Sequence, residues 1–299
     1  MFKVLWIVLT ALSVLAPCRA QAAGPVISQQ TRLMVFSPHP DDESLGAAGL
    51  IQGVLKAGGR VQVVFMTNGD GFPAGVKKAD NLSQPTAADY RRYGAARRLE
   101  ALKAKAISGV KARDVIFLGF PDAGLACLQQ KFLAGPTPYR SPFTLATHPP
   151  ASKTIIPHTD FTGRDLIREI EQIITDFRPN LVATTPAQDR HPDHSATYFF
   201  VNRALTEVRQ DHPLLKPKVL AFLIHFGKWP VDQGADTGSR LAPPKGFPDK
   251  GIHWVSFLLT PEEVADKTRA IRHYYTQMLV MGRFMLSFAK SNELFIQEN

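Results

Sequence analysis

Cysteine is scarce in this 299-residue chain, which contains only Cys18 and Cys127. Cys18 lies in a stretch that we expect to be removed on export, so Cys127 would remain alone. A single cysteine cannot form an internal disulfide, a cysteine-based zinc site or a CxxC redox pair. Stability must therefore come from a hydrophobic core, which a chain of this length can build.

Long apolar runs are absent beyond the N-terminus. Residues 4–16 are apolar, Lys3 precedes them, and small residues follow at Ala20, Ala22 and Ala23. This layout predicts a secretory signal peptide, cut after Ala20 or Ala22. A retained membrane anchor is the weaker alternative, because the run is shorter than the ~20 residues that a span needs.

The signal peptide sets our expectations for domains and location. We expect residues 1–22 to be removed and residues 23–299 to form one domain that is exported, either periplasmic or secreted. Cys18 lies near a position typical of lipoprotein cleavage, but Pro17 directly before it argues against lipidation. No later apolar run reaches ~18 residues, so we expect no transmembrane segment in the mature protein.

The chain is basic, with a formal net charge of +9. Loss of the signal peptide would lower this to +7, because Lys3 and Arg19 leave with it. The positive residues are scattered, and Arg91, Arg92, Arg97 and Arg98 read as the solvated face of a helix. We therefore expect no nucleic-acid partner.

Short apolar runs alternate with helical patterns along the chain. This alternation predicts a mostly parallel sheet with helices on both faces. The expected strands are 32–36, 60–67, 114–120, 180–186, 218–226 and 253–259, and the expected helices are 45–58, 87–107, 162–177, 194–208 and 260–278. Residues 121–163 and 229–252 read as long loops.

A cluster of acids follows the first strand in the stretch "SPHPDDE", residues 37–43. Carboxylates this close repel one another and resist burial, so they need a compensating positive charge. A metal ion would supply that charge, provided that another part of the chain offers the remaining ligands.

A second cluster follows a later strand in "PAQDRHPDHSA", residues 186–196. His191 and His194 are three residues apart, as are His39 and Asp42, and both clusters fall on the same rim of the predicted sheet. Either stretch alone is compatible with a turn or a helix cap. Together they predict a metal site, and three His and Asp ligands with one open position are typical of catalytic zinc.

These motifs resemble the PIG-L (LmbE-like) family of zinc-dependent de-N-acetylases. The resemblance covers essentially the whole mature chain, and the supporting stretches are "PHPDDE", "HPDH", "TNGDG" (67–71), "FLGFPDAGL" (117–125) and "KTRAIRHYYTQ" (267–277). It implies a Rossmann-like α/β fold, in agreement with the strand–helix alternation.

The resemblance also implies a role for each matching residue. His39, Asp42 and His194 would bind one Zn²⁺ per chain, and Asp41 would be the general base. His191 would protonate the departing amine or stabilise the charged tetrahedral intermediate. The implied reaction removes acetyl from an N-acetylated amino sugar or glycoconjugate by attack of metal-bound water.

Five further residues are candidates for supporting roles. Glu43 would act behind the ligands or at a helix N-terminus. Asp189 would orient His191 or His194, or simply cap a helix. Asp70 and Asp122 would contact sugar hydroxyls or serve as turn residues, while His225 would line the pocket or lie in the core. The alternatives stay open for each, and a core position is also the interpretation for His273 and Tyr274.

Two other functions fit the same residues. The protein could be a zinc hydrolase of another amide or of an ester, since no residue excludes that. It could also be a non-catalytic glycan-binding protein, although pure binding requires neither Asp41 nor an open metal position. The segments 121–163 and 229–252 match no motif, so the substrate stays unidentified.

Overall fold

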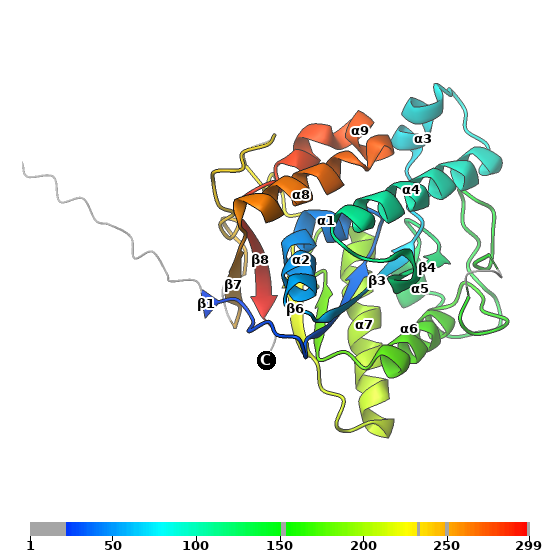
Figure 1. The fold of residues 1–299 in the computed structure, drawn as a ribbon. Coiled ribbons are helices and arrows are strands. Elements are labelled where there is room, and N and C mark those ends of the chain that lie inside the picture. Colours follow the sequence, from blue (N-terminus) through cyan, green and yellow to red (C-terminus); the bar gives the residue numbers. More distant parts are fainter. Residues whose placement is uncertain (1–21, 151–153, 232–233, 249–250, 298–299) are drawn as a thin grey trace, which may run out of the picture.

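A computed structural model describes residues 22–150, 154–231, 234–248 and 251–297 (Figure 1). The predicted signal peptide, with Cys18, lies outside these residues except for Ala22. Among the described residues, no helix is long and apolar enough to cross a membrane. The described chain forms a single α/β domain around one sheet, as the sequence predicts.

Within the described residues, the sheet contains eight strands in the order β1-β7-β8-β6-β5-β2-β3-β4, and all pairs are parallel except those made by β8. The strands are β1 (Ala22–Ala23), β2 (Arg32–Ser37), β3 (Arg60–Thr67), β4 (Val115–Phe120), β5 (Leu181–Thr184), β6 (Lys218–Phe222), β7 (His253–Leu258) and β8 (Asn292–Gln297). The helices are α1 (Asp42–Gly46), α2 (Ala48–Lys56), α3 (Pro73–Asp80), α4 (Ala87–Ile107), α5 (Leu125–Gln130), α6 (Gly163–Phe177), α7 (Pro192–Asp211), α8 (Pro261–Arg272) and α9 (Tyr275–Leu286).

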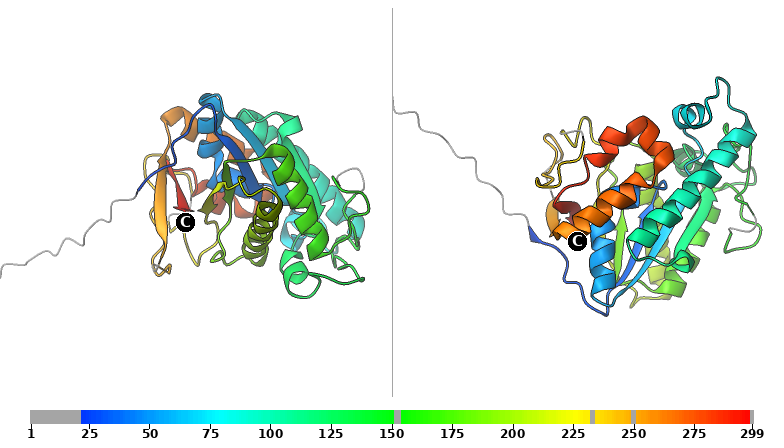
Figure 2. Two further views of the ribbon diagram at one scale, coloured as in Figure 1. Left: turned by 90° about the horizontal axis from the view of Figure 1, so that it is seen from below. Right: turned by 45° about the horizontal axis from the view of Figure 1, so that its top comes forward.

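Alternate residues of the central strands build two separate cores. In β2, Leu33 and Val35 belong to one core, whereas Met34 and Phe36 belong to the other. This follows from the strand geometry, in which successive side chains point to opposite faces. Helices α2, α4 and α8 cover the first face and α5, α6 and α7 the second, as the views in Figure 2 show. Buried strands of this kind read as continuous apolar runs.

The strand order places a ligand site between β2 and β5. From β2 the chain continues through β3 to β4 on one side, and then returns to β5 on the other side of β2. Ligands bind outside the carboxyl ends of strands at such a reversal. The segments that follow β2 and β5 are the two stretches in which the sequence places the metal ligands.

Several elements differ from the sequence-based expectation. Strand β8 was not expected, because Glu293 interrupts its apolar pattern; the structure buries this acid against Lys267. The expected helix 45–58 is divided into α1 and α2 at Ala47, whose backbone is not helical. The expected helix 260–278 ends at Arg272, and α9 follows it. Helix α3 and, within the expected loop 121–163, helix α5 were also missed.

Two helix starts agree with the sequence. Thr162 caps α6 by accepting a hydrogen bond from the backbone N–H of Asp165 at 3.1 Å. Thr260 and Glu263 form a reciprocal capping box at the start of α8. These local signals survive in the tertiary structure because they depend only on residues three positions apart.

Candidate metal centre and active site

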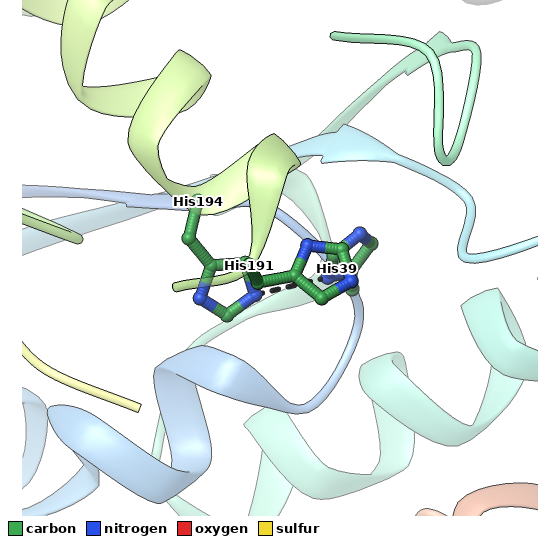
Figure 3. Close-up of side chains that lie close together, drawn as sticks. All are labelled: His39, His191 and His194. Carbon is green, nitrogen blue, oxygen red and sulfur yellow. Dashed lines mark hydrogen bonds between the residues drawn. The ribbon is translucent and has the colours of Figure 1, made fainter. Parts of the chain in front are cut away.

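The candidate ligands come from the ends of two neighbouring strands. His39 and Asp42 follow β2, and Asp42 is the first residue of α1. His194 lies in the first turn of α7, which follows β5. Because β2 and β5 pair in parallel, the two segments emerge side by side, and the rings of His39, His191 and His194 gather there (Figure 3).

Three donor atoms of these ligands form a nearly equilateral triangle. His39 Nδ1 lies 3.2 Å from Asp42 Oδ2 and 3.3 Å from His194 Nε2, and the latter two atoms are 3.2 Å apart. Donors about 2.0 to 2.1 Å from a tetrahedral ion lie about 3.3 Å from one another. The nitrogen and carboxylate donors, and their spacing, therefore fit a zinc-sized ion.

Carboxylates lie behind both imidazoles. His39 Nε2 is 3.1 Å from Asp122 Oδ1 and 3.4 Å from Asp193 Oδ2. His194 Nδ1 is 3.2 Å from Asp189 Oδ2, although this contact is poorly aligned for a hydrogen bond. Metal-binding histidines usually direct their second ring nitrogen to such a group, which holds the ring proton there. His39 Nδ1 and His194 Nε2 then direct their lone pairs toward a shared point, the place that an ion bound by the three donor atoms would occupy.

Other trios of His and acidic side chains overlap this one. His191 can join His39 and His194, and His225 can join Asp42 and His194. A third trio combines His39 with Asp122 and Asp193. It would use Nε2 of His39, the ring nitrogen that faces these two acids, rather than Nδ1. The donor atoms of His39, Asp42 and His194 lie 3.2 to 3.3 Å from one another, which matches the tetrahedral spacing.

Electrostatics couple the members of this trio. Burial would raise the pKa of Asp42, but His194 and His39 hold it well below 3.8. Burial would lower the pKa of His194, but Asp42 and Asp189 raise it to about 9. The carboxylates around the imidazoles thus create a strongly negative field, which favours a cation at this place.

Asp41 lies beside the trio in a strained backbone conformation, with φ at 145°. Its Oδ2 is 3.2 Å from Arg97 Nη2, and Arg97 also donates to the carbonyls of Pro40 and Gly69. Burial raises the pKa of Asp41 to about 8, although Arg97 opposes the shift. The expectation that Arg97 is a helix-surface charge was wrong, since its side chain is 4% exposed.

Glu43 is fully buried and points away from the trio. Its Oε1 is 2.7 Å from Lys105 Nζ and accepts a hydrogen bond from the Tyr274 hydroxyl. Its Oε2 accepts from the backbone N–H of Asp41 at 3.1 Å. Glu43 therefore supports the loop from behind, and Tyr274, though buried as expected, takes part in this support.

His191 and His225 border the trio on one side. His191 Nδ1 accepts a hydrogen bond from the Asp193 backbone N–H at 3.2 Å, so a neutral His191 carries its proton on Nε2. Burial and the neighbouring His39 and His194 lower its pKa to about 3. The His225 ring lies 5.0 Å from that of His194 and stacks on Phe284, so His225 borders the site rather than lying in the core.

The remaining candidate acids have different surroundings. Asp122 lies against His39, as above, and its Oδ2 accepts from the Gly71 N–H at 2.6 Å. Asp189 accepts from the backbone N–H groups of His191, Ile224 and His225, and so joins the ends of β5 and β6. Asp70 instead lines a cavity of about 270 Å³, whose lining includes none of the trio.

Sequence reasoning missed two residues of the site. Arg97 shares the buried face of α4 with Tyr93, Ala101 and Ala104, so helical periodicity could have shown that it points inward. Asp193 occurs in the "HPDH" stretch, but its importance depends on distant contacts: it accepts from the N–H groups of Ala123 and Leu125 as well as facing His39. No local pattern indicates such contacts.

A family model for PIG-L, described as GlcNAc-PI de-N-acetylase, matches residues 34–205, more than half of the chain. That match includes both stretches that form the trio. The chain belongs to the PIG-L family. Its members bind a metal, and His39, Asp42 and His194 each belong to overlapping groups of side chains in this chain that could hold one.

Individual PIG-L relatives agree with this assignment. A 1D-myo-inositol 2-acetamido-2-deoxy-alpha-D-glucopyranoside deacetylase of Nakamurella multipartita is 32% identical, over 78% of this chain and 72% of the relative. The solved N,N'-diacetylchitobiose deacetylase of Pyrococcus horikoshii has a TM-score of 0.54 at 16% identity, covering 89% of this chain and 83% of that one. A deacetylase solved with teicoplanin gives a TM-score of 0.55 at 20% identity, over 89% and 97%. The two solved structures support the fold.

Proposed function

We propose that this PIG-L protein is a zinc-dependent hydrolase that removes acetyl from an N-acetylated amino sugar or glycoconjugate. Membership of the family supports an amide hydrolase of the deacetylase class. The observation that carries the proposal is the spacing of the donor atoms of His39, Asp42 and His194, at 3.2 to 3.3 Å from one another. A glycan-binding protein would not need this arrangement.

His39, Asp42 and His194 would hold one zinc ion. When bound, the metal supplies a Lewis acid that polarises the amide carbonyl and lowers the pKa of water. Asp122, Asp193 and Asp189 would keep the two imidazoles oriented through their outer nitrogens. Each of these acids is itself held by backbone N–H groups, which keeps the whole arrangement rigid.

Asp41 is suited to accept a proton from the attacking water. Burial raises the pKa of its carboxyl to about 8, and a carboxylate with a raised pKa is a stronger base. Arg97 contacts Oδ2 and limits rotation of the carboxylate, so we assign proton transfer to Oδ1.

His191 is suited to donate a hydrogen bond from Nε2, since its Nδ1 is already an acceptor. A donor there would stabilise the negative oxygen of the tetrahedral intermediate. Protonation of the departing nitrogen by His191 would require the positively charged ring, because a neutral imidazole would be left as an anion; the proton that Asp41 accepts from water can serve this step instead. The sequence leaves two roles open for His191. Its lowered pKa favours stabilisation of the negative oxygen, because the neutral ring can donate that hydrogen bond.

Acetate release by the purified protein tests the proposal. We expect activity on derivatives of N-acetylglucosamine, loss of activity with a chelator, and recovery when Zn²⁺ is restored at one ion per chain. Replacement Asp41→Asn should preserve zinc content but lower kcat by about 100-fold or more. Absence of metal-dependent acetate release across a broad panel of N-acetylated sugars would contradict the proposal, and an unchanged kcat would remove Asp41 from the role of base.

We also propose that residues 1–22 direct export. The first described residues, Ala22 and Ala23, pair with Val255 and Ser256 at the edge of the sheet. Cleavage after Ala20 would retain this pairing, whereas cleavage after Ala22 would remove one of its residues. N-terminal sequencing of the protein recovered from the periplasm or medium tests export and locates the cut; an intact N-terminus in the cytoplasm would refute it.

A further inference from the structure

A groove of about 550 Å³ is built mainly by two parts of one segment, residues 226–231 and 239–245, which are yellow to gold in Figure 1. This volume is in the range of small-molecule sites. Most of the segment belongs to the stretch 229–252 that matched no family motif. The cationic residues of its lining are Arg190, Lys228, Arg240, Lys245 and Lys290, and no acidic residue of the described chain lines it.

The walls of the groove are held by packing. Trp229 is buried, its Nε1 donates to the Ala242 carbonyl at 2.8 Å, and its ring packs edge-on against Phe288. Phe226 packs against Phe247. The groove is therefore formed in advance of binding, which reduces the entropy lost when a ligand enters.

Among the described residues, the positive charge of the groove is only partly neutralised. Lys290 is buried and forms an ion pair with Asp236 at 3.2 Å. Lys228, Arg240 and Lys245 are exposed, and none of them forms an ion pair within the described residues. Clustered cations in a concave site attract an anionic ligand.

The groove adjoins the active site through two chain neighbours. Arg190 directly precedes His191, and Phe226 directly follows His225. The Arg190 N–H donates to the His225 carbonyl at 2.8 Å, and the Arg190 guanidinium lies 4.4 Å from the centre of the Phe226 ring. A substrate extending beyond its reacting sugar would thus come within reach of the groove.

We propose that this groove binds an anionic group, a phosphate or a carboxylate, that the substrate carries beyond its N-acetylated sugar. The proposal rests on the deacetylase function above and narrows its substrate to anionic glycoconjugates. Lys228 and Lys245 supply the charge that attracts the group, and Arg190 holds it nearest to the histidines.

Paired substrates test the proposal. The values of kcat/KM are measured for a neutral N-acetylglucosamine methyl glycoside, for N-acetylglucosamine 1-phosphate, and for N-acetylglucosamine linked to glucuronate. We expect kcat/KM for at least one anionic substrate to exceed that for the neutral substrate by about tenfold. The double variant Lys228→Gln/Lys245→Gln should lower this anionic-to-neutral ratio of kcat/KM by about tenfold. The two anionic arms distinguish phosphate from carboxylate, and added salt should reduce the ratio.

A matched control removes the same charge elsewhere. Lys216 and Lys218 are exposed at the start of β6, the opposite end of that strand from the site, so Lys216→Gln/Lys218→Gln should leave the ratio unchanged. A native ratio near one, or equal ratios in the native protein and the groove variant, would overturn the proposal. So would an equal fall of the ratio in the control.

Direct binding separates this proposal from the proposed function. Calorimetry with N-acetylglucosamine 1-phosphate should show a Kd that rises about tenfold in Lys228→Gln/Lys245→Gln and stays unchanged in the control. If no substrate releases acetate, the deacetylase function fails, and this measurement still decides the groove. Equal Kd values in all three proteins would reject the groove as an anion site.

Discussion

The part of the chain that the structure describes contains two fully buried lysine–glutamate pairs, which are alike in geometry but differ in what they support. Lys105 Nζ lies 2.7 Å from Glu43 Oε1, and Lys267 Nζ lies 2.7 Å from Glu293 Oε1. All four side chains are 0% exposed. Burying such charges is costly unless their remaining hydrogen-bonding atoms are also satisfied.

The second contacts of each glutamate show the difference. Glu293, on β8, accepts hydrogen bonds from the backbone N–H groups of Gly49 and Leu50 at 2.8 and 3.0 Å. These groups lie in the first turn of α2, where an N–H has no partner within the helix. Glu293 therefore fixes a helix to the sheet. Glu43 accepts from the Asp41 N–H and the Tyr274 hydroxyl, and so fixes the loop that carries the proposed base.

The comparison teaches that an ion pair cannot be assigned a role from its own geometry. A non-glycine residue with a positive φ, such as Asp41, costs of order 1–3 kcal/mol and persists only where its surroundings enforce it. The Lys105–Glu43 pair belongs to those surroundings, whereas the Lys267–Glu293 pair acts on the scaffold. Four variants can break or sharpen this distinction.

The largest expected effect comes from removing each lysine. Lys105→Met and Lys267→Met should each lower the free energy of unfolding by about 3–5 kcal/mol, because an uncompensated carboxylate stays buried. Only Lys105→Met should also lower kcat of the folded enzyme, since only Glu43 holds Asp41. Urea denaturation and steady-state kinetics at low temperature measure both effects. Equal losses of kcat in the two variants would abolish the distinction.

Replacement Tyr274→Phe should have a smaller effect, confined to the Glu43 pair. It removes a hydroxyl that donates to a buried carboxylate, so we expect a loss of about 1.5–3 kcal/mol in the free energy of unfolding. We expect kcat to fall by about tenfold while KM and zinc content stay constant, because Asp41 is displaced but the ligands are not. A purely structural role for Tyr274 would instead leave kcat unchanged.

The smallest effect on the free energy of unfolding is expected from Asp70. Unlike Glu43 and Glu293, this carboxylate has no lysine partner among the described residues. Burial and the charge of Asp122 raise its pKa to about 7, so the folded protein binds more protons here than the unfolded chain between pH 4 and 7. Stability contributed by this group is therefore lost as the pH rises through that range. Asp70→Asn should raise the free energy of unfolding by about 1–2 kcal/mol at pH 8 and leave it unchanged at pH 4. Equal effects at both pH values would contradict the shift.

Much of the fold was predictable because it depends on local patterns. The helix 87–107 coincides with α4, and the central strands lie within two residues of their expected bounds, except that β6 ends four residues early. Strand β8 was missed because Glu293 is acceptable in a core only with Lys267, which lies 26 positions earlier. Local patterns cannot reveal a partner so far away.

The candidate site was predictable to a similar degree. The residues His39, Asp41, Asp42, His191 and His194 were all named from two short stretches, and the structure gathers them at one end of β2 and β5. Arg97, Asp193 and the partners of Glu43, which are Lys105 and Tyr274, were not foreseen. Their importance depends on contacts with other loops and helices rather than on the residues beside them.

The sequence by itself determined the alternation of strands and helices, the two clusters of His and Asp, and the family to which they belong. Only the tertiary structure decided which nitrogen of each histidine faces the shared point, which acids lie behind it, and that a basic groove adjoins it. The physical reason is that short-range patterns set backbone conformation, whereas charges buried far apart in the chain acquire their roles only when folding brings their partners within a few ångströms.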